Sequence, residues 1–339
     1  MKTQYTIPFF IVHQGCPFTC IFCSQNKISG REDPLPPSSI PSTISRYLKT
    51  ISPKANRVEV GFFGGSFTGL TIHKQEAYLK KVQPFLQKGK IHGIRLSTRP
   101  DFINQDVLDL LKKYNVSCVE LGIQSISDAV LKTAKRGHTR KDIERASRLI
   151  LKNNLILGHQ IMIGLPKSTF IQELKTAKMS VAMGASQVRI YPVIVIKGTE
   201  LGKMYKRGLY APLEEIEAIK RCAKLIRFFE KNHVKVIRCG LHPSTGLATG
   251  KDILKGPFHS AFRQKVETYL YANLFKKHIK HNDKLRSIRR IIYNPREAAS
   301  VIGYKRINAN YVENLLDRGD LFRSATSVPI GKLKLEYKD

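Results

Sequence analysis

The sequence has no run of about 18 apolar residues, few acidic residues and no cysteine pattern typical of a disulfide framework. The missing apolar run excludes an ordinary membrane-spanning helix, so we expect no membrane partner. The first residues are polar and lead into a segment that is broken by Pro8 and a cysteine cluster, unlike a secretory signal peptide. We therefore expect a cytoplasmic protein whose six cysteines are not paired in disulfides.

The shortage of acidic residues makes the chain strongly basic. It has 26 Asp and Glu against 58 Lys and Arg, which gives a formal net charge of +32. Such a charge suits a polyanionic partner, because neutralising phosphates releases their counterions, and we expect RNA to be that partner. The alternative is a lysine-rich composition without a nucleic-acid partner, which a spread of lysine along the whole chain favours more than one dense basic tail would.

Apolar, β-branched segments alternate with amphipathic ones over the first 240 residues. The segments expected to be strands are 5–12, 58–63, 91–97, 117–123, 155–163, 187–195 and 234–238. Those expected to be helices are 41–50, 72–87, 104–114, 127–153 with a break near Gly137, 168–183 and 213–232. This alternation predicts an α/β fold, a partial TIM-like (β/α)6 barrel of parallel strands with helices outside.

Gly, Pro, Ser and Thr concentrate around 240–256, and the alternation weakens after them. We expect a first domain over 1–245 that carries the functional site, and a small basic α+β extension over 246–339. Part of the extension is a basic segment with one acidic residue, Asp283; its basic residues are Lys276, Lys277, Lys280, Lys284, Arg286, Arg289 and Arg290. This segment is either a solvated face or an RNA-binding surface. In the second case we expect the nearby rings of Tyr269, Tyr271 and Tyr293 to stack on RNA bases.

Three cysteines, Cys16, Cys20 and Cys23, follow the first expected strand with the spacing C-x3-C-x2-C. Thiolates are soft ligands that suit iron–sulfur clusters and zinc. A four-iron cluster bound by three cysteines keeps one iron open for a small molecule, and the spacing favours this interpretation. The alternatives are a zinc site completed by His13 and three unligated thiols.

With Phe22 directly before its last cysteine, the cluster resembles that of the radical S-adenosylmethionine superfamily. The resemblance implies a [4Fe-4S] cluster whose open iron binds S-adenosylmethionine. Reductive cleavage of that cofactor then yields methionine and a 5′-deoxyadenosyl radical, with a small redox protein as electron donor. Gly64, Gly65 and Ser66 resemble the strand end that receives the cofactor's amino group.

Four further residues resemble cofactor contacts of the same superfamily. Gln124 and Arg136 resemble the pair that holds the ribose and the carboxylate, and a guanidinium is a good carboxylate partner. Ser97 stands where a ribose-binding carboxylate often occurs, and Gln160 stands where some relatives have aspartate. Both are expected to keep a hydrogen bond to a hydroxyl group. The residue that completes the substrate chemistry is left unassigned.

Four stretches resemble the radical domain of the catalytic subunit of Elongator, which modifies the wobble uridine of tRNA: 97–101, 121–125, 136–139 and 190–201. This resemblance implies a radical enzyme that acts on RNA, and we expect that RNA to be tRNA. Too few residues follow the barrel for Elongator's acetyltransferase domain, so its carboxymethylation is not expected. The alternatives are a small-molecule enzyme similar to oxygen-independent coproporphyrinogen oxidase and a non-catalytic, cluster-bearing RNA-binding protein.

Overall fold

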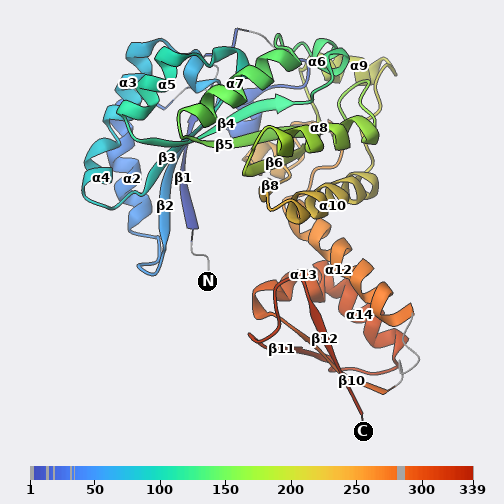
Figure 1. The fold of residues 1–339 in the computed structure, drawn as a ribbon. Coiled ribbons are helices and arrows are strands. Elements are labelled where there is room, and N and C mark those ends of the chain that lie inside the picture. The colour runs from blue at the N-terminus through green and yellow to red at the C-terminus, as the bar shows by residue number, and fades with distance from the viewer. Residues whose placement is uncertain are drawn as a thin grey trace. The chain divides into compact units, whose positions relative to one another are not determined.

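The computed structural model describes residues 4–12, 15–17, 20–30, 33, 35–280 and 287–338, in two compact units (Figure 1). Apart from a short part of one helix, residues 219–224, the first unit runs to Ser260 and the second begins at Ala261. The sequence places a boundary after residue 245, and the functional division into two domains stays a prediction.

The first unit is built on a parallel sheet of seven strands in the order β1-β2-β3-β4-β5-β6-β8. All seven correspond to expected strands: β1 (Gln4–Ile11), β2 (Arg57–Gly64), β3 (Gly93–Thr98), β4 (Val116–Gln124), β5 (Ile156–Ile163), β6 (Gln187–Pro192) and β8 (Lys235–Cys239). The predicted partial TIM-like barrel is confirmed, and its sheet stays open between the edge strands β1 and β8.

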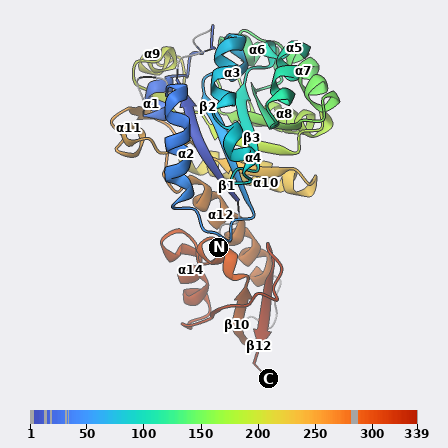
Figure 2. The same cartoon turned by 90° about the vertical axis from the view of Figure 1, so that its left-hand side faces the viewer.

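Helices between the strands flank the outside of the curled sheet in Figure 1, and Figure 2 shows α2 and α3 beside its first strands. They are α2 (Ile40–Leu48), α3 (Ile72–Lys80), α4 (Gln83–Gln87), α5 (Gln105–Lys113), α6 (Asp128–Thr133), α7 (Arg140–Lys152), α8 (Phe170–Ala182) and α10 (Glu215–Lys231). The expected break near Gly137 separates α6 from α7, which begins at a capping box of Thr139 and Asp142.

Short elements that the sequence pattern did not reveal surround the carboxyl ends of the strands. They are α1 (Gln25–Ser29), α9 (Glu200–Lys206), α11 (Thr245–Ala248) and a two-stranded antiparallel sheet of β7 (Val195–Ile196) with β9 (Ile253–Lys255). Elements of two to seven residues are too short for a hydrophobic period to be recognised. None of the helices in the described ranges has the length and apolarity that a bilayer crossing requires.

The inner face of the sheet holds a buried group of charged side chains centred on Glu120 of β4. Arg95 of β3 donates to Glu120 at 2.8 Å and to Glu59 of β2 at 2.8 Å. Arg189 of β6 donates to both carboxylate oxygens of Glu120. Burial alone would raise the pKa of Glu120, but the two arginines outweigh burial and lower it.

The second unit is a small α+β fold whose sheet has the order β11-β10-β12. Its elements are α12 (Phe262–Lys280), β10 (Ile288–Tyr293), α13 (Ala298–Ile302), α14 (Ile307–Leu315), β11 (Phe322–Ser324) and β12 (Leu333–Tyr337). Tyr271 and Tyr293 belong to its apolar core, with 7% and 9% of their surfaces exposed. The prediction that these two rings stack on RNA bases is therefore wrong, whereas Tyr269 is half-buried.

We expect Glu120→Gln to lower the free energy of unfolding by about 3–5 kcal/mol, because it leaves the charge of Arg189 buried without its partner. Glu144→Gln is the matched control: Glu144 pairs with Arg140 on the surface of α7, and the variant should cost less than about 0.5 kcal/mol. Urea unfolding of both variants measures the difference. Equal stabilities would show that the Glu120 group does not stabilise the sheet.

Candidate active site

Most of the predicted site residues lie at the carboxyl ends of strands or in the loops that follow them. Since parallel strands end at the same edge of a sheet, these loops share one rim. The loop with the three cysteines follows β1, Gly64 ends β2, and Gln124 ends β4. The parallel strand order therefore brings these motifs to the same edge of the sheet.

The cysteine loop is held against the rim by close backbone packing at Gly15. This residue has a φ of +72°, and a Cβ there would lie 2.0 Å from the carbonyl oxygen of Ser66, which only glycine avoids. On its other side, the amide of Ile21 donates to the carbonyl of Ala134 at 3.3 Å, and the carbonyl of Ile21 accepts from the amide of Leu201 at 2.8 Å. The loop is thus attached to three separate segments of the first unit.

All three cysteines of the loop are free thiols, with Cys20 buried and the other two half-buried. Burial, reinforced by the neighbouring Cys20 and Cys16, raises the pKa of Cys23 to about 12. Burial also raises the pKa of Cys16, against the opposing effect of Arg99 and Arg136. The three thiols therefore interact with one another beside two positive charges.

Among the residues that the structure describes, no three His, Cys, Asp or Glu side chains are arranged closely enough to hold a metal ion. His13, the fourth ligand of the alternative zinc site, lies outside the described residues.

Arg136 connects the cysteine loop to the end of β4. One guanidinium nitrogen, Nη1, lies 3.1 Å from the Sγ of Cys20, and Nη2 donates to the carbonyl of Gly122 at 2.7 Å. Arg99, which forms an ion pair with Asp101 at 2.9 Å, donates in turn to the carbonyl of Arg136. The Nε of Arg136 is buried and finds no partner within the described part of the chain.

Gln124 stands beside Arg136 in an unusual backbone conformation. Its φ is +62°, and the pairing of β4 with β5 shifts register between Gly122 and Gln124. A residue other than glycine is strained in this left-handed backbone conformation, and such strained residues are frequent at functional sites. Its side-chain oxygen Oε1 is buried and, among the described residues, unpartnered. The rim therefore holds two neighbouring side chains that each have one buried polar atom without a partner among the described residues, Nε of Arg136 and Oε1 of Gln124.

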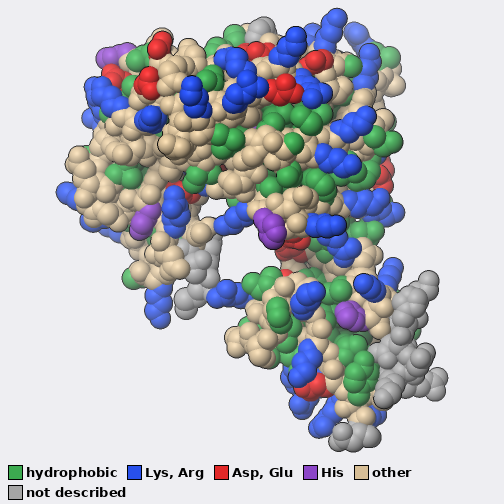
Figure 3. All heavy atoms as spheres, in the orientation of Figure 1, with side chains coloured by type: hydrophobic (Ala, Val, Ile, Leu, Met, Phe, Trp, Pro, Cys, Tyr) green, Lys and Arg blue, Asp and Glu red, His purple; other side chains and the backbone are tan. Residues whose placement is uncertain are grey.

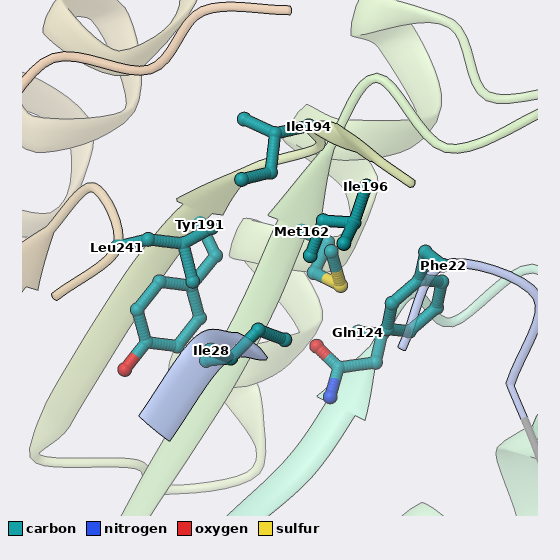
Figure 4. A pocket seen from close by; sticks show the side chains of 8 residues that line it. All are labelled: Phe22, Ile28, Gln124, Met162, Tyr191, Ile194, Ile196 and Leu241. Carbon is teal, nitrogen blue, oxygen red and sulfur yellow. The ribbon is translucent and has the colours of Figure 1, made fainter. Parts of the chain in front are cut away.

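A cavity of about 110 Å³ opens next to these groups (Figure 4). Phe22 and Gln124 lie toward one end of it, and Tyr191 and Leu241 lie at the other. Its walls are mainly apolar and consist of Phe22, Ile28, Gln124, Met162, Tyr191, Ile194, Ile196 and Leu241. Of these, only Phe22 and Gln124 were predicted as site residues, because an apolar residue that lines a cavity has the same sequence pattern as one in the core.

The remaining predicted residues differ in what their side chains contact. The hydroxyl of Ser66 is bonded to Thr98 at 2.8 Å and accepts from the amide of Arg99, so this side chain is occupied within the protein. Gln160 donates to the hydroxyl of Ser97 at 2.6 Å and to Glu120 at 3.2 Å. These two side chains thus contact each other and the buried charge group. Their contacts with a cofactor stay predictions.

Gly64 adopts a φ of +99° at the end of β2, and Gly65 follows it directly. A residue with a Cβ is strained at that φ, so the turn out of β2 favours glycine. Their contact with a cofactor also stays a prediction.

Comparison with known proteins places the chain in context. Residues 10–179 match the family model described as the radical SAM superfamily, and residues 185–272 match that of the Radical_SAM C-terminal domain. The chain is 29% identical over 193 residues to a tRNA uridine(34) acetyltransferase of Methanocaldococcus infernus, a match that covers 51% of this chain and 36% of that protein. It thus spans about a third of the length of that relative.

Two further similarities extend over more of the chain. An uncharacterized protein of Methanocaldococcus jannaschii is 29% identical, over 60% of this chain and 66% of its own length. The solved structure of Elp3 from Methanocaldococcus infernus superposes with a TM-score of 0.63 at 23% identity, over 80% of this chain and 64% of that one. At this identity the superposition shows a shared fold.

We expect Gly15→Ala to reduce the iron bound after anaerobic reconstitution to less than about half of the wild-type content, because the added Cβ collides with the Ser66 carbonyl. Gly89→Ala is the matched control, since Gly89 also has a positive φ but no atom within 4 Å of an added Cβ. Iron per chain is measured by colorimetric assay. Equal iron content in the two variants would contradict the role of this packing.

We also expect His138 to make folding stability depend on pH. Burial, and then Arg136 and Arg99, lower its pKa from 6.5 to about 3, so below pH 6.5 the unfolded chain binds a proton that the folded chain does not. The contribution of His138 to the free energy of unfolding is therefore complete well above pH 6.5 and falls on acidification. Between about pH 8 and about pH 5 it falls by about 2 kcal/mol. In urea unfolding at both pH values, His138→Gln should have the shallower pH dependence; equal slopes would refute this.

Proposed function

The chain belongs to the radical SAM superfamily, and from this membership we propose that it is an enzyme that reductively cleaves S-adenosylmethionine at a [4Fe-4S] cluster in order to modify RNA, specifically tRNA. The observation that carries the proposal is the rim of the first unit. There, three free thiols lie beside Arg136, whose Nε is buried without a described partner, as is the Oε1 of the adjacent Gln124.

The donor set of this rim fits the cluster and the cofactor that the superfamily implies. Cys16, Cys20 and Cys23 supply three soft ligands, and the nearby charges of Arg99 and Arg136 partly offset the effect of burial, which raises the pKa of Cys16. The cluster, when bound, supplies the electron that breaks a carbon–sulfur bond of S-adenosylmethionine. The protein has to orient that cofactor and protect it from side reactions.

The chain's own residues perform these two tasks. Arg136 is positioned on both sides, by the thiol of Cys20 and the carbonyl of Gly122, so its guanidinium is already oriented for a carboxylate. Gln124 is held in a strained backbone with a free acceptor for a hydroxyl group. The apolar cavity wall, including Phe22 and Met162, excludes water from the place where a reactive carbon has to lie.

The proposal of an RNA substrate is supported by charge and by the relatives. The net charge is +32, and Figure 3 shows Lys and Arg side chains across the visible face of both units with far fewer acidic ones. In the second unit, four exposed basic residues belong to α12 and β10: Lys276, Lys277, Arg289 and Arg290. The similar protein of Methanocaldococcus infernus has a name that describes action on a tRNA uridine.

We expect reconstituted, dithionite-reduced protein to convert S-adenosylmethionine to 5′-deoxyadenosine, quantified by chromatography. The triple variant Cys16→Ala/Cys20→Ala/Cys23→Ala should produce none. Arg136→Gln should bind iron and lose at least about tenfold in rate, because a charge-assisted hydrogen bond is removed. Arg148→Gln, an exposed arginine of α7, is the control. A full cluster without cleavage in the wild type would instead favour a non-catalytic cluster-binding protein.

We further expect salt-dependent binding of unfractionated tRNA, measured by filter binding between 50 and 200 mM salt. Lys276→Gln/Lys277→Gln/Arg289→Gln/Arg290→Gln should weaken binding and flatten the dependence of affinity on salt. The matched control removes four exposed lysines near the amino ends of β2 and β3, away from the rim: Lys49, Lys54, Lys88 and Lys90. No binding at low salt would refute an RNA substrate, and equal effects of the two variants would refute the α12–β10 surface.

A further inference from the structure

Two arginines lie side by side on neighbouring strands at the β8 edge of the sheet. Arg189 of β6 and Arg238 of β8 are direct register partners. Arg189 is fully engaged: it donates twice to Glu120, and its guanidinium carbon lies 4.8 Å from the centre of the Phe63 ring. Arg238 has no such partner, which makes it the exception among the arginines of the inner face.

The contacts of Arg238 leave its charge uncompensated. Its Nε donates to the carbonyl of Gly240 at 3.1 Å, and its Nη2 lies 3.4 Å from the Nδ1 of His242. No described carboxylate pairs with it; the nearby charged or ionisable groups are Arg189, Tyr191 and Cys239. Burial and the charge of Arg189 lower the pKa of Arg238, which is the effect expected for a guanidinium that lacks an anion.

This unpaired charge lies near Tyr191, a residue that lines the end of the cavity opposite Phe22 and Gln124. Tyr191, whose ring lies at that end in Figure 4, follows Arg189 by two residues on β6 and interacts electrostatically with Arg238. Leu241, at the same end, is in the loop that leaves β8. The next residue in that loop, His242, is exposed and stacks on Phe10 of β1 with ring centres 6.4 Å apart. The charge thus lies close to one residue that lines the cavity, Tyr191, and to one exposed residue, His242.

We propose that Arg238 is the substrate's anion-binding residue and that it binds a phosphodiester of the RNA backbone next to the nucleoside that occupies the cavity. His242 and the hydroxyl of Tyr191 are the neighbouring polar groups of this subsite. The proposal rests on the proposed RNA substrate for the identity of the anion, whereas the subsite itself rests on the unpaired guanidinium. A guanidinium suits phosphate because its planar set of donors matches two phosphate oxygens.

An unpaired charge beside a like charge also has a consequence for stability. A structural arginine stabilises the fold, so its removal lowers the melting temperature. Arg238 is the register partner of the like-charged Arg189 and pairs with no described carboxylate, so Arg238→Gln should leave the melting temperature in chloride unchanged or raise it. A binding residue that is kept at the expense of stability behaves in this way.

The first experiment tests the subsite without RNA. Melting temperatures of the full-length wild type, Arg238→Gln and Arg148→Gln are compared in potassium phosphate and in potassium chloride of equal ionic strength. Phosphate stabilises proteins in general, and that effect is common to all three. We expect phosphate binding to raise the melting temperature further in the wild type and in Arg148→Gln, but not in Arg238→Gln. The same rise in Arg238→Gln, or a lower melting temperature of that variant in chloride, would overturn the subsite.

The second experiment tests the source of the phosphate. Binding of a labelled five-nucleotide RNA of mixed sequence is measured by fluorescence anisotropy. We expect Arg238→Gln to weaken binding about tenfold, Arg238→Lys to recover part of the loss, and Arg148→Gln to change it less than about twofold. If a mixture of nucleoside 5′-monophosphates binds at Arg238 and the oligonucleotide does not, the backbone assignment is wrong. If no RNA binds while phosphate still stabilises the wild type, the RNA function fails and the anion subsite stands.

Discussion

The pairing of Glu120 with Arg95 and Arg189 is the interaction on which the interior of the first unit depends. A carboxylate with 1% of its surface exposed is stable in its charged form only if its partners lie in place, so the side chains of β3, β4 and β6 cannot be arranged independently. Gln160 extends the group to Ser97 on the rim side. The same charge group therefore connects five neighbouring strands, β2 to β6, across the inner face of the sheet.

The rim at the carboxyl ends of the strands is assembled by contacts between segments that lie far apart in the sequence. Arg136 bonds the thiol of Cys20 and the carbonyl of Gly122, and Arg99 holds the carbonyl of Arg136. Gly15 permits the cysteine loop to touch the backbone that follows β2. Each of these contacts restricts a residue that we propose to bind the cluster or the cofactor, and such restriction preorganises a site.

The two ends of the cavity share one property. At the cysteine end, Gln124 and Arg136 have buried polar atoms without described partners, and at the other end Arg238 has a charge without a described carboxylate. In a protein selected only for stability, these groups would have hydrogen-bond or ion-pair partners within the chain. Their arrangement suggests a division of the cavity, with the radical chemistry common to the superfamily at one end and the recognition of this protein's own substrate at the other.

The sequence by itself determined the order of elements and the cluster motif. Strand and helix periods are local properties, so all seven strands of the sheet and the break between α6 and α7 were predictable, as was the C-x3-C-x2-C loop after β1. Periodicity also shows that Glu120, Gln160 and Arg189 occur in buried strands, but it does not show which partners they meet. Such contacts depend on strand order and register.

Only the tertiary structure decided those contacts. It brought Ser97 to Gln160 and placed Arg238 beside Arg189, and it buried Tyr271 and Tyr293 in a core where sequence analysis had expected two exposed rings. The physical reason is that a side chain's role follows from the groups across the sheet, which lie tens of residues away along the chain. Spacing along the chain predicts the cluster ligands, whereas packing across the sheet decides which polar groups are left without a partner.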